Sequence, residues 1–322
     1  MQVTHGIVQP GGGPMGLTIG NFDGVHRGHR AMLDRMVVKS RELRLPSCVL
    51  TFEPHPREFF SPSTAPTRLT RLREKLELIA EAGVDRVHVI RFDARLAALA
   101  AARFIEDVLL RGLGVRWLLV GRDFRFGAKR AGDFVQLEAA AAQHGFALEA
   151  MPDVLDGSTP GGQRVSSSRV RAALAAGDLE VAARLLGRAY TMSGRVAHGE
   201  KLGRTLGFPT ANIVLRRPPP LAGIFAVEAE IEEMRDEEMR GQSRPALRGV
   251  ASVGRRPTVK ENAPPLLEVH LFGWSGELYG RHLRVKFRRK LREEEKYEGL
   301  AALRHAIDQD VARAKDYFNR NG

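Results

Sequence analysis

The chain has 322 residues, 43% hydrophobic and 27% charged, with a formal net charge of +12, which suits a globular protein of one or two domains that attracts anions, from polyphosphates to nucleic acids. It has no uninterrupted apolar stretch of roughly 20 residues, the length of a membrane span, and residues 1–15 lack the basic and apolar regions of a secretory signal. Cys48 is the single cysteine, which excludes an intramolecular disulfide and a thiolate-rich zinc site, so we expect a cytoplasmic protein.

The first half of the chain, up to about Gly187, alternates short apolar runs with helical patterns. The runs predict buried strands, and the stretches between them repeat apolar residues at spacings of three and four, as on one face of a helix. Strands separated by helices need crossover connections, which predicts a doubly wound parallel sheet of the α/β class. Ligands bind at the carboxyl ends of such strands, so we expect chemistry in the loops that begin at Gly20, Phe52 and Gly121. The predicted strands are Leu17–Gly20, Ser47–Phe52, Val87–Ile90, Trp117–Gly121 and Phe146–Met151.

From Tyr190 onward the pattern changes to short β-rich runs bounded by glycine, proline or charged residues. Closely spaced strands of this kind predict a small antiparallel β-barrel, and a helical pattern from Tyr297 to Val311 closes the chain. A helical connector at Asp178–Leu186 precedes the change, so we expect domains at 1–187 and 188–322. The predicted strands are Tyr190–Val196, Thr210–Leu215, Gly223–Ile231, Leu247–Gly254, Leu266–Phe272 and His282–Phe287.

The most informative stretch, residues 20–29, reads Gly-Asn-Phe-Asp-Gly-Val-His-Arg-Gly-His and lies between a predicted strand and a predicted helix. Backbone N–H groups and the positive end of the helix dipole gather at such a junction and favour a bound phosphate. His26 and His29 are three residues apart, so both can point toward one bound group, and Gly28 leaves room for its approach. Imidazoles there can donate hydrogen bonds that stabilise charge during nucleotidyl transfer. Zinc is a poor alternative, because the His-Glu-x-x-His pattern is absent.

This stretch resembles the signature of the bacterial bifunctional riboflavin kinase/FAD synthetases, members of the His-x-Gly-His nucleotidyltransferase superfamily. The likeness continues in the family's order through residues 51–56, 120–127, 164–171 and 185–190. It implies that His26 and His29 contact the phosphates of ATP, and that Asp123 contacts either the nucleotide or the flavin. Taken alone, residues 166–171 fit an ordinary helix N-cap cluster equally well. The implied nucleotide or phosphate contacts are Gly20, Phe22, Asp23, Gly28, Asp123, Ser167, Ser168 and Arg171.

Polar side chains also mark two predicted strands of the second half. Alternation puts Thr210 and Asn212 on one face, where a hydroxyl and an amide oxygen suit Mg²⁺ together with phosphate oxygens. Glu268 faces away from the apolar residues of its strand, so its carboxylate can accept a proton from an attacking alcohol, as kinases require. The segment 199–203 can fold over phosphates as a glycine loop. On these patterns alone, solvent-facing polar residues are the commoner interpretation.

Residues 194–212, with the core Gly-Arg-Thr-Leu-Gly-Phe-Pro-Thr-Ala-Asn, resemble the riboflavin kinase signature. Three further segments, 253–258, 267–270 and 291–296, follow in the family's order. The resemblance implies an enzyme that phosphorylates riboflavin with ATP to FMN and then adenylylates FMN to FAD. It further implies Thr210 and Asn212 as holders of the Mg²⁺–nucleotide, Glu268 as the general base and Arg292 near the flavin-binding loop. It also implies nucleotide contacts in the glycine loop, at Gly199, Lys201, Gly203 and Thr205.

Two other functions stay open on the sequence. His-x-Gly-His also marks class I aminoacyl-tRNA synthetases and other adenylyltransferases, although those enzymes lack the context of residues 208–212. A basic nucleic-acid-binding barrel is the second, but such barrels stack bases on aromatic side chains, and here aromatics are only 7% without a recurrent strand-face pattern. We therefore expect ATP, riboflavin and FMN as small-molecule partners and Mg²⁺ as cofactor, with no nucleic-acid or membrane partner.

Overall fold

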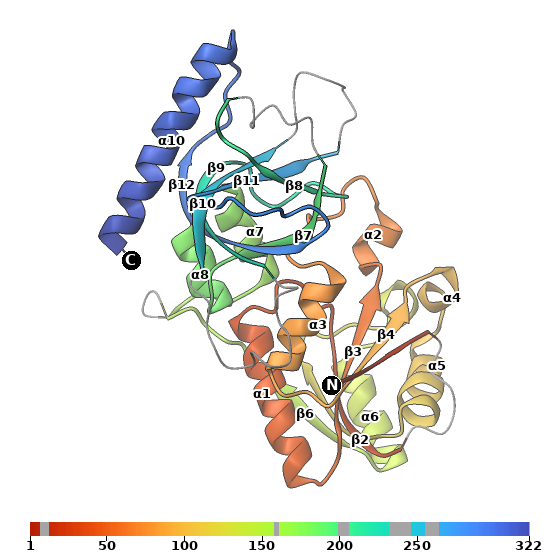
Figure 1. Cartoon of the computed structure of the whole chain (residues 1–322). Coiled ribbons are helices and arrows are strands. Elements are labelled where there is room, and N and C mark those ends of the chain that lie inside the picture. The colour runs from red at the N-terminus through yellow and green to blue at the C-terminus, as the bar shows by residue number, and fades with distance from the viewer. Residues whose placement is uncertain (7–12, 158–160, 199–205, 232–245, 255–263, 322) are drawn as a thin grey trace. The chain divides into compact units, whose positions relative to one another are not determined.

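The structure is a computed structural model that describes residues 1–6, 13–157, 161–198, 206–231, 246–254 and 264–321 (Figure 1). Its contacts divide the chain into two compact units. The first comprises Met1–Pro66 and Thr70–Ser167, and the second comprises Thr67–Leu69 and Ser168–Gly322. Among the described residues, no helix combines the length and the apolar character that crossing a membrane would need.

The first unit is built on a six-stranded sheet with the order β1-β4-β3-β2-β5-β6, in which every pair of neighbours is parallel. The strands are β1 (Gln2–His5), β2 (Met15–Ile19), β3 (Ser47–Glu53), β4 (Arg86–Arg91), β5 (Val115–Gly121) and β6 (Ala147–Met151). All five predicted strands are present, and β1 is an additional strand at the edge. The prediction of a doubly wound parallel sheet is confirmed.

Helices between the strands cover both faces of this sheet. Leu118 and Leu119 are successive residues of β5, both are fully buried, and they belong to different hydrophobic clusters. Since successive side chains of a strand point to opposite faces, each face carries its own core. The helices are α1 (Arg27–Glu42), α2 (Pro56–Phe60), α3 (Leu72–Glu81), α4 (Ala94–Ala97), α5 (Ala101–Arg103), the π-helix Phe104–Gly112, the short 3₁₀ helix Ala128–Arg130 and α6 (Phe134–His144).

The second unit contains a closed antiparallel barrel with the strand order β10-β11-β8-β7-β12-β9. Its strands are β7 (Thr191–Ala197), β8 (Ala211–Val214), β9 (Gly223–Ile231), β10 (Leu247–Gly254), β11 (Leu266–Leu271) and β12 (His282–Arg292). All six predicted strands are present, and the predicted terminal helix is α10 (Leu300–Asn321). The prediction of a small antiparallel barrel with a terminal helix is confirmed.

Two further helices, α7 (Ser167–Ala175) and α8 (Leu179–Leu186), precede the barrel. Gly177, in the turn between them, has a φ of +74°, a conformation that glycine adopts without strain. A Cβ at this position would overlap the side chain of Lys290, so the turn lies directly against β12. The contacts thus group α8 and nearly all of α7 with the barrel, whereas the functional limits 1–187 and 188–322 stay a prediction.

Candidate active sites

The first candidate site is a cavity of about 390 Å³ in the first unit, where β2, β5 and β6 end. β2 lies between β3 and β5, so the winding of the sheet reverses at this point. Doubly wound sheets bind ligands at such a switch point. The loops that begin at Gly20 and Gly121 contribute to the wall, as expected, but Phe52 is not among the described residues that line it.

The loop from Gly20 to His29 has an unusual backbone that its own side chains hold in place. Phe22 and Val25 have left-handed φ angles of 48° and 38°, which cost a non-glycine residue about 1–2 kcal/mol each. The ring of Phe22 is fully buried in the core. Asp23 Oδ1 accepts hydrogen bonds from the backbone N–H (3.0 Å) and the hydroxyl (3.2 Å) of Thr70. Asp23, predicted as a phosphate contact, thus anchors the loop and is not among the residues described as lining the cavity.

His26 and His29 come together in the wall of the cavity, as their spacing predicts. His26 is the N-cap of α1, since its Nδ1 accepts a hydrogen bond from the backbone N–H of His29 (3.3 Å). The two imidazole rings stack with centroids 3.7 Å apart. A Cβ on Gly28 would lie 3.2 Å from the His26 ring and 3.5 Å from the carbonyl oxygen of Val165, which explains the glycine between the histidines. With Nδ1 of His26 as acceptor, its other ring nitrogen is the one that can donate to a ligand.

His29 is held neutral by its surroundings. Burial lowers the pKa of His29 well below its usual value of 6.5, and the electrostatic effects of His26, Lys75 and Arg164 lower it further. Its Nδ1 is enclosed and has no hydrogen-bond partner among the described residues. An enclosed polar atom without a partner is costly, so this nitrogen is suited to a polar group of a bound ligand.

Arg164 bridges two carboxylates at the mouth of the same cavity. Its Nη1 donates to Asp123 Oδ2 (2.7 Å), and its Nε pairs with Asp153 Oδ1 (3.0 Å). The hydrogen bond from Arg164 lowers the pKa of Asp123, so this carboxylate is ionised. Asp123 lines the cavity as the sequence predicts, but Arg164 and Asp153 were not singled out. The signal available for Asp153 was the end of β6, since Pro152 and Asp153 directly follow the third strand that reaches this edge.

The serine-rich segment at the start of α7 is divided between the units. Ser166 lines the cavity, and the hydroxyl of Ser167 donates to the carbonyl oxygen of Asp23 (2.9 Å). Ser168 and Arg171 belong to the second unit, where Nε of Arg171 donates to the carbonyl oxygen of Thr67 (2.6 Å). These two hydrogen bonds, from Ser167 and Arg171 to backbone carbonyls, fix the start and the flank of α7.

The second candidate site begins with a row of side chains that crosses the barrel. The register pairs Asn212 of β8 with Glu268 of β11, and Glu268 with Ser252 of β10. It continues from Ser252 to Ile224 of β9, and from Ile224 to Arg292 of β12. Directly opposed residues of antiparallel strands point to the same face, with Cβ atoms roughly 4.5–5.5 Å apart. An amide, a carboxylate and a hydroxyl thus lie next to one another.

This row lies on the outer face of the barrel. Leu267 and Val269, the neighbours of Glu268 on β11, are 0% and 1% exposed and fill the interior, while Glu268 is half-buried. The predicted alternation of this strand is confirmed. Glu268 therefore faces Asn212 and the surface instead of the packed core, where a substrate can reach it.

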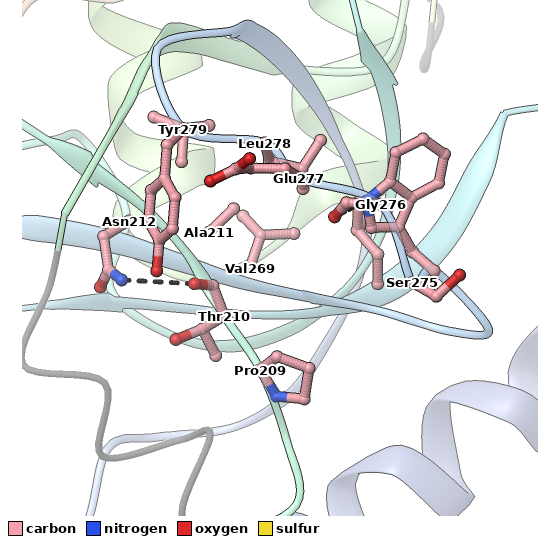
Figure 2. Close-up of a pocket in the computed structure, with 13 residues that line it drawn as sticks. Pro209, Thr210, Ala211, Asn212, Val269, Ser275, Gly276, Glu277, Leu278 and Tyr279 are labelled. Carbon is pink, nitrogen blue, oxygen red and sulfur yellow. Dashed lines mark hydrogen bonds between the residues drawn. The ribbon is translucent and has the colours of Figure 1, made fainter.

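A cavity of about 450 Å³ borders the row and contains Thr210 and Asn212 in its wall. Figure 2 shows the two residues close together, with the hydroxyl of Tyr279 directed toward them. Nδ2 of Asn212 donates to the carbonyl oxygen of Thr210 (3.4 Å). Oδ1 of Asn212 is enclosed and accepts no hydrogen bond from any described residue. The predicted metal-binding pair is thus brought together, with one amide oxygen left over for a ligand.

Arg292, which the sequence places near a flavin-binding loop, is engaged in a buried ion pair. Its Nε and Nη2 donate to the two carboxylate oxygens of Asp310 on α10, at 2.9 and 2.7 Å. Asp310 is only 2% exposed. The predicted glycine-loop contacts Gly199, Lys201, Gly203 and Thr205 lie outside the described residues.

Two family models match consecutive stretches of this chain. The model of FAD synthetase matches residues 12–169, and the model of riboflavin kinase matches residues 186–318. The first stretch contains the cavity with His26 and His29, and the second contains the row with Asn212 and Glu268. Each model therefore covers one of the two candidate sites.

Curated relatives match almost the whole chain. A bifunctional riboflavin kinase/FMN adenylyltransferase of Pseudomonas fluorescens is 51% identical over 300 residues, 92% of this chain and 91% of its own length. The protein of that name from Escherichia coli K12 is 48% identical over 303 residues, 94% of this chain and 92% of its own length.

A solved structure has the same fold over nearly the entire chain. The crystal structure of a macrolide-efflux protein from Streptococcus pneumoniae has a TM-score of 0.78 and covers 98% of this chain and 99% of its own, at 24% identity. At that identity the likeness concerns the fold alone. With the two models and the two relatives, the assignment is plain: the chain belongs to the family of bifunctional riboflavin kinase/FMN adenylyltransferases.

Proposed function

We propose that this protein makes FAD from riboflavin in two steps, a kinase step in residues 188–322 and an adenylyl-transfer step in residues 1–187. The observation that carries the proposal is the match of two different family models to non-overlapping stretches, each with its own site. ATP is the second substrate of both steps. The formal net charge of +12 favours the binding of its negatively charged polyphosphate.

In the kinase step, the 5′-hydroxyl of the ribityl chain attacks the γ-phosphorus of ATP. A bond from the hydroxyl oxygen to phosphorus forms, the bond from that phosphorus to the β-phosphate oxygen breaks, and ADP leaves. We assign Glu268 as the group that accepts the hydroxyl proton. Its half-buried place opposite Asn212, on the face away from the packed interior, supports this role.

We further propose Mg²⁺ as the cofactor of the kinase step, with Thr210 and Asn212 as its protein ligands. The partnerless Oδ1 of Asn212 and the neighbouring Thr210 hydroxyl are the hard oxygen donors that this ion prefers. Mg²⁺ is typically held by one or two protein groups with phosphate oxygens and water, and the described residues include no group of three or more His, Cys, Asp or Glu that would form a full metal cage. Bound with ATP, the ion would neutralise phosphate charge.

In the adenylyl-transfer step, a phosphate oxygen of FMN attacks the α-phosphorus of a second ATP. The new phosphorus–oxygen bond forms as the bond to the pyrophosphate oxygen breaks, and pyrophosphate leaves. We assign His26 and His29 as hydrogen-bonding partners of the transferred phosphate. The stacking of their rings in the cavity wall and the enclosed Nδ1 of His29 support this role. Arg164 lines the same cavity, where it is paired with Asp123 and Asp153.

A direct assay tests the proposal. Purified protein is incubated with riboflavin, ATP and Mg²⁺, and the products are separated by chromatography; FMN and ADP should appear first, then FAD and pyrophosphate. A second incubation that starts from FMN isolates adenylyl transfer. Absence of both flavin products would refute the function, and tight RNA binding without turnover would favour the nucleic-acid-binding alternative.

A further inference from the structure

The row that crosses the barrel is covered at one end. Ile224 of the row packs with Ala314 and Phe318 of α10 in one hydrophobic cluster, so this helix covers that part of the outer face. Glu268 and Ser252, the two members of the row that precede Ile224, are half-buried. A substrate that reaches Glu268 can therefore extend over Ser252 as far as α10.

The carboxylate of Glu294 lies beside this part of the row. Glu294 is an exposed residue in the segment between β12 and α10. Its Oε1 accepts a hydrogen bond from the hydroxyl of Ser252 at 3.0 Å. The backbone of Gly254 lies so close to the carboxylate that a Cβ there would overlap it. The side chain of Glu294 is therefore seated on β10, next to Ser252.

A buried ion pair fixes the segment that carries Glu294. Arg292 forms two hydrogen bonds with the carboxylate of Asp310 and, through Nη1, a third with the carbonyl oxygen of Glu293 (2.9 Å). Bidentate pairs between arginine and a carboxylate define orientation as well as distance. The backbone immediately before Glu294 is thus tied to α10, so its carboxylate has a defined place.

The electrostatic effects on Glu294 place it near a second carboxylate. Burial raises the pKa of Glu294, the hydrogen bond from Ser252 lowers it, and the negative charge of Glu268 raises it further. Two neighbouring carboxylates favour a ligand that donates hydrogen bonds to both of them. A chain with several hydroxyl groups is such a ligand, since each hydroxyl has one proton to donate.

The proposed kinase reaction determines the direction in which the substrate extends from Glu268. In phosphoryl transfer the attacking and leaving oxygens are roughly in line, so the alcohol and the nucleotide lie on opposite sides of the transferred phosphate. Asn212, the proposed ligand of Mg²⁺, is the neighbour of Glu268 on one side, and Ser252 is its neighbour on the other. Neighbouring strands are about 4.8 Å apart, a distance that the carbon chain next to the 5′-hydroxyl can span. The side toward Ser252 is therefore the one left for that chain.

We propose that Glu294 binds secondary hydroxyls of the ribityl chain and makes the kinase site selective for a polyhydroxylated alcohol. An ionised carboxylate has about four lone-pair positions, and the hydrogen bond from Ser252 occupies one of them. The others can accept hydrogen bonds from the substrate, which are stronger than those between neutral groups. The inference rests on the proposed kinase function, with the 5′-hydroxyl at Glu268.

The test compares riboflavin with the analogue in which a 5-hydroxypentyl chain replaces the ribityl chain. This analogue keeps the ring and the terminal hydroxyl but lacks the secondary hydroxyls. Glu294→Ala should lower kcat/KM for phosphorylation of riboflavin by about 10–100-fold and change that of the analogue by less than about two-fold. Glu294→Gln, which accepts hydrogen bonds without a charge, should fall between wild type and Glu294→Ala. Glu293→Ala is the matched control, since that side chain is 74% exposed and pairs with Lys290.

A second variant displaces the carboxylate without removing it. The added Cβ of Gly254→Ala would overlap the carboxylate of Glu294, so this variant should also lose activity toward riboflavin and keep its activity toward the analogue. Turnover of the analogue reports in each preparation that the kinase site is folded.

The outcomes separate this inference from the proposed function. Equal losses for the two substrates in Glu294→Ala, or an unchanged preference for riboflavin in either variant, overturn the inference. Wild-type protein that phosphorylates both substrates equally well also overturns it, although the kinase function then stands. Wild-type protein that phosphorylates neither substrate overturns the proposed kinase function itself.

Discussion

The two proposed sites offer different chemical groups to the same proposed co-substrate, ATP, and the difference follows the nucleophile. In the barrel, the proposed nucleophile is a hydroxyl that must lose a proton, and Glu268 stands in the row opposite Asn212. In the cavity of the first unit, the proposed nucleophile is a phosphate, which is already ionised near neutral pH. There the carboxylates of Asp123 and Asp153 are both paired with Arg164. The described carboxylates of the first site thus hold an arginine, whereas the barrel places Glu268, the proposed base, beside the proposed ligand Asn212.

The sites also differ in how their groups are held. In the first, one strained loop holds the two histidines, with Phe22 buried beneath it and Asp23 bonded to Thr70. The second is built on strand register, which brings residues far apart in the sequence into one row. A substitution in the loop should therefore affect only the residues of the loop. A substitution in the barrel should affect every residue of the row whose position depends on the strand register or on the contact with α10.

The largest expected effect comes from removing the proposed base. Glu268→Gln keeps the shape of the side chain but accepts no proton, so FMN formation should slow by roughly 10²–10⁴-fold. FMN-to-FAD conversion by the same preparation should stay close to wild type. Separate turnover assays from riboflavin and from FMN measure both. Parallel loss of the two activities in folded protein would show that the sites are not independent.

The next effect concerns the ion pair that ties Arg292 of β12 to Asp310 of α10. Asp310→Ala leaves Arg292 without its buried partner, which should lower the free energy of unfolding by about 3–5 kcal/mol. Asp316→Ala on the same helix is the matched control, because its pair with Arg320 is exposed and should contribute at most about 1 kcal/mol. Denaturant titration of both variants measures the difference. An equal loss of unfolding free energy in the two variants would show that burial does not make the Arg292–Asp310 pair more stabilising than the exposed pair.

Removing the enclosed imidazole of the first site should act on the other reaction. His29→Ala should slow FAD formation from FMN by roughly 10²–10³-fold, since one preorganised donor to the transferred phosphate is lost. FMN formation should be spared. His144→Ala, at an exposed position in the same unit, serves as the control. A wild-type rate of FAD formation in His29→Ala would show that this histidine does not act on the phosphate.

Sequence patterns predict most of this fold because its periodicity is strong. The eleven predicted strands are apolar or alternate clearly, and each is present. β1 escapes prediction because its residues are mostly polar and exposed and show no alternation. It is held instead by its pairing to β4 and by a hydrogen bond between Thr4 Oγ1 and His88 Nδ1 (2.7 Å). Such a tertiary contact leaves no local signal.

The candidate sites were predictable to different degrees for the same reason. His26, Gly28 and His29 lie within four successive residues, so their spacing alone predicts that both histidines can face one bound group. The place of Arg292 was not predictable, because its partner Asp310 lies eighteen residues further on and is selected by the packing of α10. Likewise, only the register shows that Ser252 is opposite Glu268.

The smallest expected effect is a difference between the two units in how their stability depends on pH. Burial lowers the pKa of both His29 and His88 from the usual 6.5, so the unfolded chain binds protons near pH 6.5 that the folded first unit resists. Stability from these groups is complete above about pH 6.5 and falls below it, by up to about 1.4 kcal/mol per pH unit for each histidine. Glu294 in the second unit has the opposite sign, because its raised pKa favours the protonated form.

Native-state amide hydrogen exchange can follow both units in one sample. Protection factors, corrected for the intrinsic pH dependence of exchange, should fall in α1 and β4 between about pH 7.5 and 5.5, whereas those in β10 and β11 should fall less. His88→Asn, which keeps polar atoms next to Thr4 and Gly6, should make β4 less sensitive to pH. Equal losses of protection in both units would mean that the buried histidines do not set the acid response. The contrast between the acid responses of the two units would then not hold.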